Sequence, residues 1–127
     1  MHNLSITLVQ ANLYWQDIAA NLQYFTALLA SVQQTDVIVL PEMFSTGFSM
    51  NAAALAEPMV GSAVQWMKEL ATQKQCAVTG SLIIAEGGNY FNRLVWVMPD
   101  GKLHTYDKRH LFSLTDEPNV FTAGTNR

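Results

Sequence analysis

The chain is organised around Val37–Phe48, VIVLPEMFSTGF. This stretch begins with a wholly apolar run rich in β-branched side chains, which predicts a short strand covered on both faces, as in a parallel sheet packed between layers. Pro41 ends this strand because proline has no backbone N–H to donate to a neighbouring strand. Glu42 follows directly. Open α/β sheets usually keep their sites beyond the carboxyl ends of their strands, so Glu42 is a candidate for an acid/base site.

Patterns on both sides of this stretch predict an α/β fold. Leu4–Gln10 alternates apolar and polar residues, which is typical of a strand, and Gln16–Val32 has apolar residues at helical spacing. Strand, helix and strand in this order form a βαβ unit, so the first two strands should be parallel. The later predictions are a helix over Ser62–Lys74, strands over Cys76–Ile84, Tyr90–Met98 and Leu103–Tyr106, turns at Gly87–Asn89 and Pro99–Gly101, and a polar loop over Asp107–Arg127.

Three local features refine this prediction. Ser62 and Gln65 have the spacing of a capping box at the start of the second long helix. The preceding Ala-rich segment, Asn51–Val60, contains Pro58, which breaks any helix there. Gly80, inside the third strand, marks either a weak point or a close approach of backbone.

The composition bounds the class of protein. The 127 residues are one domain or part of a larger one; 50% are hydrophobic and 13% are charged, so a core is expected and disorder is not. The net charge of −3 and the absence of a basic cluster argue against nucleic-acid binding. No apolar run approaches the roughly 20 residues of a membrane helix, and no signal peptide is visible. One cysteine excludes an internal disulfide, so we expect a cytoplasmic protein.

Three charged residues lie where predicted strands end: Glu42, Lys108 and Glu117. If they converge, the two carboxylates hold the lysine charged. The proximity of the two carboxylates to each other raises the pKa of at least one of them, which suits a general base. A fixed ammonium beside a base is also an oxyanion stabiliser. Each residue has a structural alternative as well, since Glu42 could cap a helix and the other two could be solvated loop charges.

Other chemistries find little support in the sequence. Cys76 opens a predicted strand and has no neighbouring histidine, so we interpret it as a small core residue rather than a nucleophile. The three histidines show no metal-ligand spacing, and we predict no metal site. Gly87-Gly88 is too short for a phosphate-binding loop, and no G-x-S-x-G elbow surrounds a serine.

The same residues resemble motifs of the nitrilase, or carbon–nitrogen hydrolase, superfamily. Leu40–Phe44 resembles its Pro-Glu segment, and Tyr106–Phe112 resembles its lysine segment. Asn92 matches an asparagine that is common before the lysine hairpin. The matches continue downstream at Glu117, Phe121 and Gly124, so the resemblance runs over essentially the whole chain in the family's order.

The resemblance implies an α-β-β-α sandwich and a Glu-Lys-Cys triad, with no metal or organic cofactor. By that match Glu42 is the general base, Lys108 stabilises the oxyanion, and Glu117 is a second carboxylate that orients Lys108. The family's cysteine follows these segments, so it is expected beyond residue 127, and Cys76 does not match it. Residues 1–127 are therefore expected to form the N-terminal portion of such a domain, with an incomplete second sheet and no activity alone.

Within the superfamily, PEMFSTGFSM and YDKRHLFS most resemble the bacterial omega-amidase branch. That resemblance implies release of ammonia from 2-oxoglutaramate or 2-oxosuccinamate, with a homodimer in the full-length form; the substrate-binding residues stay unknown. Two alternatives remain open. One is a non-catalytic α/β binding domain or pseudoenzyme of the same fold. The other is a nucleotide- or flavin-binding domain, although no Gly-rich fingerprint follows the first strand.

Overall fold

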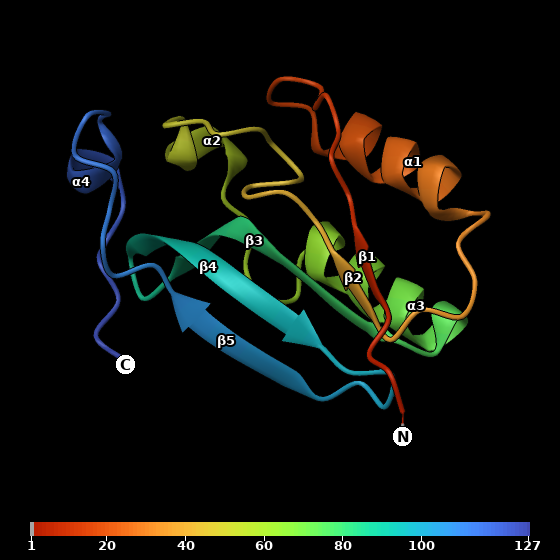
Figure 1. Cartoon of the computed structure of the whole chain (residues 1–127). Coiled ribbons are helices and arrows are strands. Elements are labelled where there is room, and N and C mark those ends of the chain that lie inside the picture. Colours follow the sequence, from red (N-terminus) through yellow and green to blue (C-terminus); the bar gives the residue numbers. More distant parts are fainter. Residues whose placement is uncertain (1) are drawn as a thin grey trace.

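The structure, a computed structural model, describes residues 2–127. Five strands form one sheet in the order β1-β2-β3-β4-β5 (Figure 1). The strands are β1 (Ile6–Leu8), β2 (Val37–Val39), β3 (Ala77–Glu86), β4 (Asn89–Val97) and β5 (Leu103–Asp107). The helices are α1 (Ile18–Leu29), α2 (Ala52–Leu55), α3 (Ser62–Lys74) and α4 (Glu117–Val120). The predicted α/β class is confirmed, with all five strands in one β layer rather than two.

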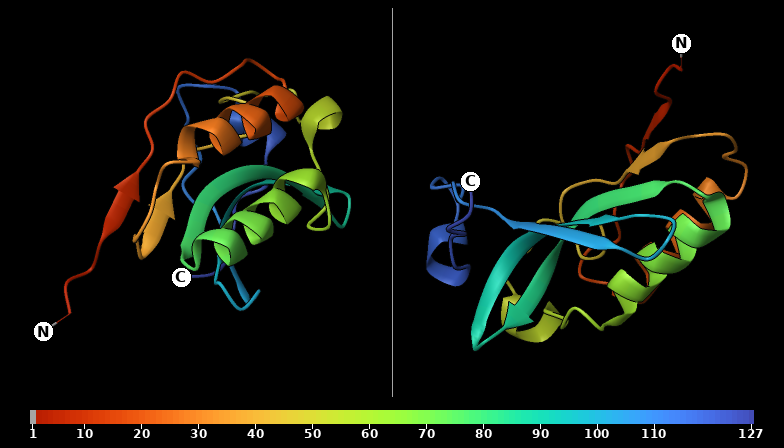
Figure 2. Two further views of the ribbon diagram at one scale, coloured as in Figure 1. Left: turned by 90° about the vertical axis from the view of Figure 1, so that its right-hand side faces the viewer. Right: turned by 90° about the horizontal axis from the view of Figure 1, so that it is seen from below.

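The sheet is parallel at one side and antiparallel at the other. β1 pairs with β2 and β2 pairs with β3 in parallel, as the βαβ pattern predicts for the first two strands. β3, β4 and β5 form an antiparallel meander. The β3–β4 turn is Gly87-Gly88, with φ of 58° and 80°, values that a two-residue hairpin turn requires of its central residues. The twisted hairpin projects away from β1, as Figure 2 shows.

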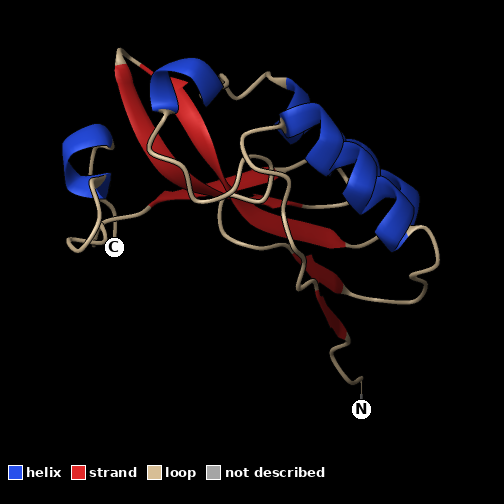
Figure 3. Ribbon diagram, turned by 90° about the horizontal axis from the view of Figure 1, so that it is seen from above, coloured by secondary structure: helices blue, strands red, loops and turns tan. Residues whose placement is uncertain are grey.

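The two long helices cover one face of the sheet and make the main core with it (Figure 3). Asp17 caps α1 by accepting a hydrogen bond from the Ala20 N–H at 3.0 Å, and α3 has the bounds that the sequence predicts. The large buried side chains of this core come from both helices, from alternate positions of the strands and from the turn after β2: Phe25, Leu29, Ile38, Phe44, Val64, Met67, Val78, Leu82, Ile84 and Val95.

The opposite face of the sheet carries exposed apolar side chains. Leu94 and Tyr106 are cross-strand neighbours there, and they are 40% and 38% exposed. On the edge strand β1, Ile6 and Leu8 are 51% and 76% exposed. The side-chain alternation of strands puts the main core on the other face, so within residues 2–127 this face of the sheet is open.

Two short helices, α2 and α4, lie in segments for which the sequence predicted none. Each has four residues, which is too few for a helical period to show in the sequence. Their stability comes instead from a second apolar cluster beyond the main core, to which Ala52 and Phe121 contribute with Met43 and Ile83.

The predicted capping box at Ser62 is wrong. The N-cap of α3 is Gly61, and its first turn is capped by a carboxylate from outside the helix. Glu57 accepts hydrogen bonds from the backbone N–H and the hydroxyl of Ser62, at 3.0 and 2.6 Å, and from the N–H of Ala63 at 3.1 Å. A charged acceptor at a helix N-terminus is favourable, and it displaces the local serine cap.

Gly80 is a close-approach position, one of the two possibilities that the sequence left open. A Cβ atom there would lie 2.9 Å from Leu40 Cβ and 2.9 Å from Phe44 Cδ1. Both neighbours flank Glu42 in sequence, so the missing side chain lets the segment around Glu42 pack on β3.

We predict that Gly80→Ala lowers the free energy of unfolding by about 1–3 kcal/mol, because the added methyl group overpacks the contact with Leu40 and Phe44. Chemical denaturation measures this change. Ala53→Ser, which adds one heavy atom at an exposed helix position, is the matched control and should be near neutral. Equal stabilities of the two variants would contradict the prediction.

Candidate active site

Glu42 stands on a turn that β3 holds in place. The Leu40 N–H still donates to the Thr79 carbonyl at 2.8 Å, and Met43 then has a φ of 48°, which is uncommon for a residue other than glycine. The Met43 N–H donates to the Ser81 hydroxyl at 2.9 Å, and the Met43 side chain is fully buried. These contacts stabilise the strained turn and leave the Glu42 side chain half exposed above the sheet.

Lys108 follows the last residue of β5, and both its backbone N–H and its backbone carbonyl are hydrogen-bonded. Its N–H donates to the Asn92 carbonyl at 2.9 Å, and its carbonyl accepts from the Gly124 N–H at 3.0 Å. The preceding residue, Asp107, accepts a 2.6 Å hydrogen bond from the buried Arg93 guanidinium. The backbone that carries the lysine is therefore anchored to β4 and to the C-terminal segment.

Glu117 is the first residue of α4, and its side chain is 0% exposed. Its N–H donates to the Thr115 hydroxyl at 3.3 Å, and that hydroxyl donates to the Phe112 carbonyl at 2.8 Å. A carboxylate this deeply buried needs a cationic partner, because the desolvation of a lone charge is costly.

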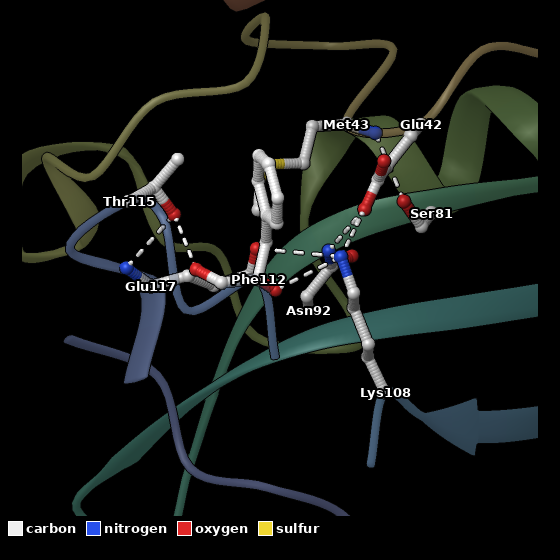
Figure 4. Close-up of polar contacts among 8 residues, drawn as sticks. All are labelled: Glu42, Met43, Ser81, Asn92, Lys108, Phe112, Thr115 and Glu117. Atoms are coloured by element: carbon white, nitrogen blue, oxygen red, sulfur yellow. Dashed lines mark hydrogen bonds and ion pairs between the residues drawn. The ribbon is translucent and has the colours of Figure 1, made fainter. Parts of the chain in front are cut away.

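The structure brings all three predicted site residues together (Figure 4). The Lys108 Nζ atom donates to Glu42 Oε1 at 2.9 Å and to Glu117 Oε2 at 3.3 Å. It also lies 3.1 Å from Glu117 Oε1 and 5.5 Å from the centroid of the Phe48 ring. The ammonium therefore lies between two carboxylates, one from the turn after β2 and the other from the first residue of α4.

This environment keeps Lys108 charged. Burial by itself lowers the pKa of Lys108, but the hydrogen bonds from the ammonium to Glu42 and Glu117, together with their negative charges, outweigh burial. The pKa of Lys108 is consequently raised above its ordinary value. A lysine in this state is a fixed cation at neutral pH and not a base.

Asn92 is a fourth member of the cluster. Its side chain is buried on β4, and its Nδ2 atom donates to Glu42 Oε1 at 2.8 Å. The sequence pointed to Asn92 only through the resemblance, and it assigned no role to either Asn92 or Ser81. The register of β3 and β4 is the signal that could have grouped Ser81 with Asn92. Asn92 pairs with Ile83, which lies two residues from Ser81 on the same face of β3.

Two cavities meet at the ion pair, and Glu42 and Lys108 line both. One, of about 300 Å³, lies over the open face of the sheet and is walled by Leu94, Tyr106 and Thr79. The other, of about 480 Å³, is bounded by Phe48 and the segment after Lys108, including His110. Mostly apolar walls around a few convergent charges are typical of small-molecule sites.

Cys76 lies outside this site. It is 2% exposed in the main core and lines neither cavity, and burial raises the pKa of its thiol. Within residues 2–127 no group of three His, Cys, Asp or Glu side chains could hold a metal ion. In the same part of the chain, no helix has the length and apolar character needed to cross a membrane.

The comparisons with known proteins agree with one another. Residues 5–126 match the carbon–nitrogen hydrolase family. The chain is 43% identical to the omega-amidase YafV of Yersinia enterocolitica, over its whole length and 49% of that relative. It is 32% identical to the 2-oxoglutaramate amidase of Bacillus subtilis, over 73% of this chain and 37% of that one.

A solved structure covers the same region. It is XC1258 of Xanthomonas campestris, a CN-hydrolase superfamily protein with an arsenic adduct in its active site. It superimposes with a TM-score of 0.96 at 44% identity, over 100% of this chain and 48% of that chain. The chain thus spans about half the length of the relatives that it matches most fully. From its family match, its relatives and its fold, the chain belongs to the carbon–nitrogen hydrolase family, also called the nitrilase superfamily.

Proposed function

We propose that the whole protein is an omega-amidase, which releases ammonia from the terminal amide of 2-oxoglutaramate or 2-oxosuccinamate. The observation that carries this proposal is the Lys108 ammonium, 2.9 Å from Glu42 and 3.1 Å from Glu117, at the junction of two cavities. The chain's similarity to an omega-amidase and to a 2-oxoglutaramate amidase supports the substrate class.

The proposed mechanism gives each charged residue one task. Glu42 takes the proton from a cysteine thiol, and the thiolate attacks the amide carbonyl carbon. Lys108 stabilises the negative oxygen of the tetrahedral intermediate, and Glu117 keeps Lys108 in place and charged. When the C–N bond breaks, the proton held by Glu42 goes to the leaving nitrogen, and ammonia departs. Water, deprotonated by Glu42, then cleaves the thioester and restores the thiol.

The nucleophile in this mechanism does not come from residues 1–127. Their one cysteine, Cys76, is buried in the core with a raised thiol pKa, so it is not a thiolate aimed at the site. We propose that the sulfur belongs to the part of the domain that the relatives have and these residues do not cover. Residues 1–127 are then the N-terminal portion of one domain, and we further propose a cytoplasmic homodimer that needs no cofactor.

We predict that Lys108→Gln and Glu42→Gln each lower kcat for 2-oxoglutaramate by about 100- to 1,000-fold in the whole protein, because each removes a charge that acts in the transition state. Ammonia release measures this. Lys102→Gln changes an exposed lysine just before β5, at the opposite end of that strand from Lys108; it is the control and should keep wild-type activity. Wild-type rates in the Lys108 and Glu42 variants would contradict the roles proposed for these residues, whereas a wild-type protein that releases no ammonia would favour a non-catalytic binding domain.

The substrate class has its own test. Wild-type whole protein should hydrolyse 2-oxoglutaramate in preference to aliphatic nitriles or carbamoylated amines, and the three kcat/KM values decide this. A preference for a nitrile or a carbamoylated amine would overturn the omega-amidase assignment, while the charged cluster would still belong to a carbon–nitrogen hydrolase.

Cys76→Ala should leave kcat of the whole protein unchanged, because the thiol packs in the core away from both cavities. In addition, a polypeptide of residues 1–127 alone should release no more ammonia from amides than its Cys76→Ala variant does. Amide hydrolysis that depends on Cys76 in either polypeptide would contradict the proposed origin of the nucleophile.

Glu117→Gln should lower the pKa of Lys108 and destabilise the fold by about 1–3 kcal/mol at neutral pH, because a buried carboxylate loses its charge beside the ammonium. The raised pKa of Lys108 in the folded state means that its pairs stabilise the protein fully below pH 10.5, and that this contribution is lost as the pH rises through the raised value. The stability difference between wild type and variant should therefore shrink at high pH.

Denaturation at several pH values and NMR titration of Lys108 measure these two effects. The control is Asp116→Asn, which removes a carboxylate from the exposed neighbouring position. If Glu117→Gln leaves the Lys108 pKa where it is, Glu117 does not hold the ammonium.

A further inference from the structure

We propose that Asn92 is the positioning residue that determines which oxygen of Glu42 accepts the proton; this inference rests on the amidase function proposed above. The Asn92 Nδ2 atom donates to Glu42 Oε1 at 2.8 Å, and the Lys108 ammonium donates to the same oxygen at 2.9 Å. Figure 4 shows the two donors converging on one side of the carboxylate.

The other oxygen of Glu42 is left available. Within residues 2–127, Oε2 accepts no hydrogen bond from the protein, and the Glu42 side chain is 50% exposed beside both cavities. A carboxylate with one oxygen held by two donors has a fixed orientation, and the lone pairs of its other oxygen point away from those donors. Oε2 is therefore the oxygen that faces the reacting thiol and, later, the water.

Asn92 also fixes the position of Lys108. Its backbone carbonyl accepts the Lys108 N–H at 2.9 Å, while its side chain holds Glu42. Asn92 lies within β4 and pairs with Ile83 of β3, so it is part of the most extensive strand pairing in the sheet. One rigid residue thus sets the distance and the angle between the proposed base and the proposed oxyanion stabiliser.

The other end of the Asn92 amide has no hydrogen-bond partner among the described residues. Asn92 is 2% exposed, and within the described residues its Oδ1 atom is buried without a hydrogen-bond partner. Buried polar atoms are normally paired, and an unpaired acceptor destabilises a fold. The reverse orientation of the amide would place Oδ1 against the Glu42 carboxylate, which also accepts only. The side chain therefore serves Glu42 at the expense of its own oxygen.

Ser81 and Asn92 fix different parts of the Glu42 segment, the backbone and the side chain. Ser81 holds the backbone of the turn through the Met43 N–H, at 2.9 Å, and does not touch the Glu42 side chain. A half-exposed glutamate has several free side-chain torsions, so a fixed backbone alone would leave its carboxylate mobile. The contact from Asn92, together with that from Lys108, restricts that freedom.

The experiment compares Asn92→Ala and Asn92→Asp with Asn89→Ala and Asn89→Asp in the whole protein. Asn89 lies on the same strand at an exposed position, so its variants control for the change of residue type. The Asn92 variants should lower kcat for 2-oxoglutaramate roughly 10- to 100-fold with KM nearly unchanged, because the base is misplaced and substrate binding is not. The Asn89 variants should match wild type.

The pH profile separates positioning from a structural role. In Asn92→Asp, a second carboxylate beside Glu42 disfavours its ionised form, so the acid limb of the kcat/KM profile should move to higher pH. A variant that is merely less stable would lose active protein without moving this limb. Aspartate has nearly the shape of asparagine, so the Asn92→Asp variant distinguishes positioning from a structural role even if Asn92→Ala does not fold. Wild-type kcat and an unmoved acid limb in folded Asn92→Asp would overturn the proposal.

Crystal structures of the same variants show the position of the Glu42 carboxylate, and this measurement does not depend on activity. The Glu42 carboxylate should leave its contact with Lys108 in Asn92→Ala and Asn92→Asp but not in the Asn89 variants. If wild-type protein hydrolyses no amide while the carboxylate moves, the amidase proposal fails and the positioning by Asn92 holds. If wild type is active while the carboxylate stays and the kinetics do not change, the positioning by Asn92 fails.

Discussion

The structure depends on one electrostatic constraint: Glu117 is 0% exposed, and the ammonium of Lys108 is the cation that compensates it. An isolated carboxylate would be expensive at this depth, so the loop after β5, the short helix α4 and the turn after β2 must meet around one Nζ atom. This requirement links the ends of segments that are far apart in the sequence. Because the same contacts hold Lys108 charged, the constraint that organises the loops also produces the electrostatics of the site.

Much of the fold was predictable from local pattern. The wholly apolar run at Val37–Val39 and the amphipathic segment at Ser62–Lys74 identified β2 and α3, because each pattern lasts for most of its element. The helices α2 and α4 were missed because one turn shows no period, and each depends on contacts with distant residues. The capping prediction at Ser62 failed for a related reason, since the capping carboxylate of Glu57 lies outside the short motif.

The candidate site was predictable in part. Glu42, Lys108 and Glu117 each follow or lie beyond a predicted strand, and the family resemblance supplied their grouping, which spacing alone does not. The contacts that orient them come from the interiors of β3 and β4, where Ser81 and Asn92 look like ordinary polar residues of a strand. Only the register of the hairpin and the left-handed backbone of Met43 reveal that these two residues face the turn carrying Glu42.

The C-terminal segment has a consequence for how the site tolerates change. Gly124 passes so close to Asp107 that a Cβ atom at position 124 would overlap the carbonyl group of Asp107, and the Gly124 N–H donates to the Lys108 carbonyl. Any side chain at this position must push the end of β5 aside, and with it the peptide that carries the lysine. Gly124 has no ionisable group, but its replacement would displace the Lys108 ammonium from its two carboxylates. Substitutions at position 124 should therefore be scarce for an electrostatic reason, although glycine itself takes no part in the electrostatics.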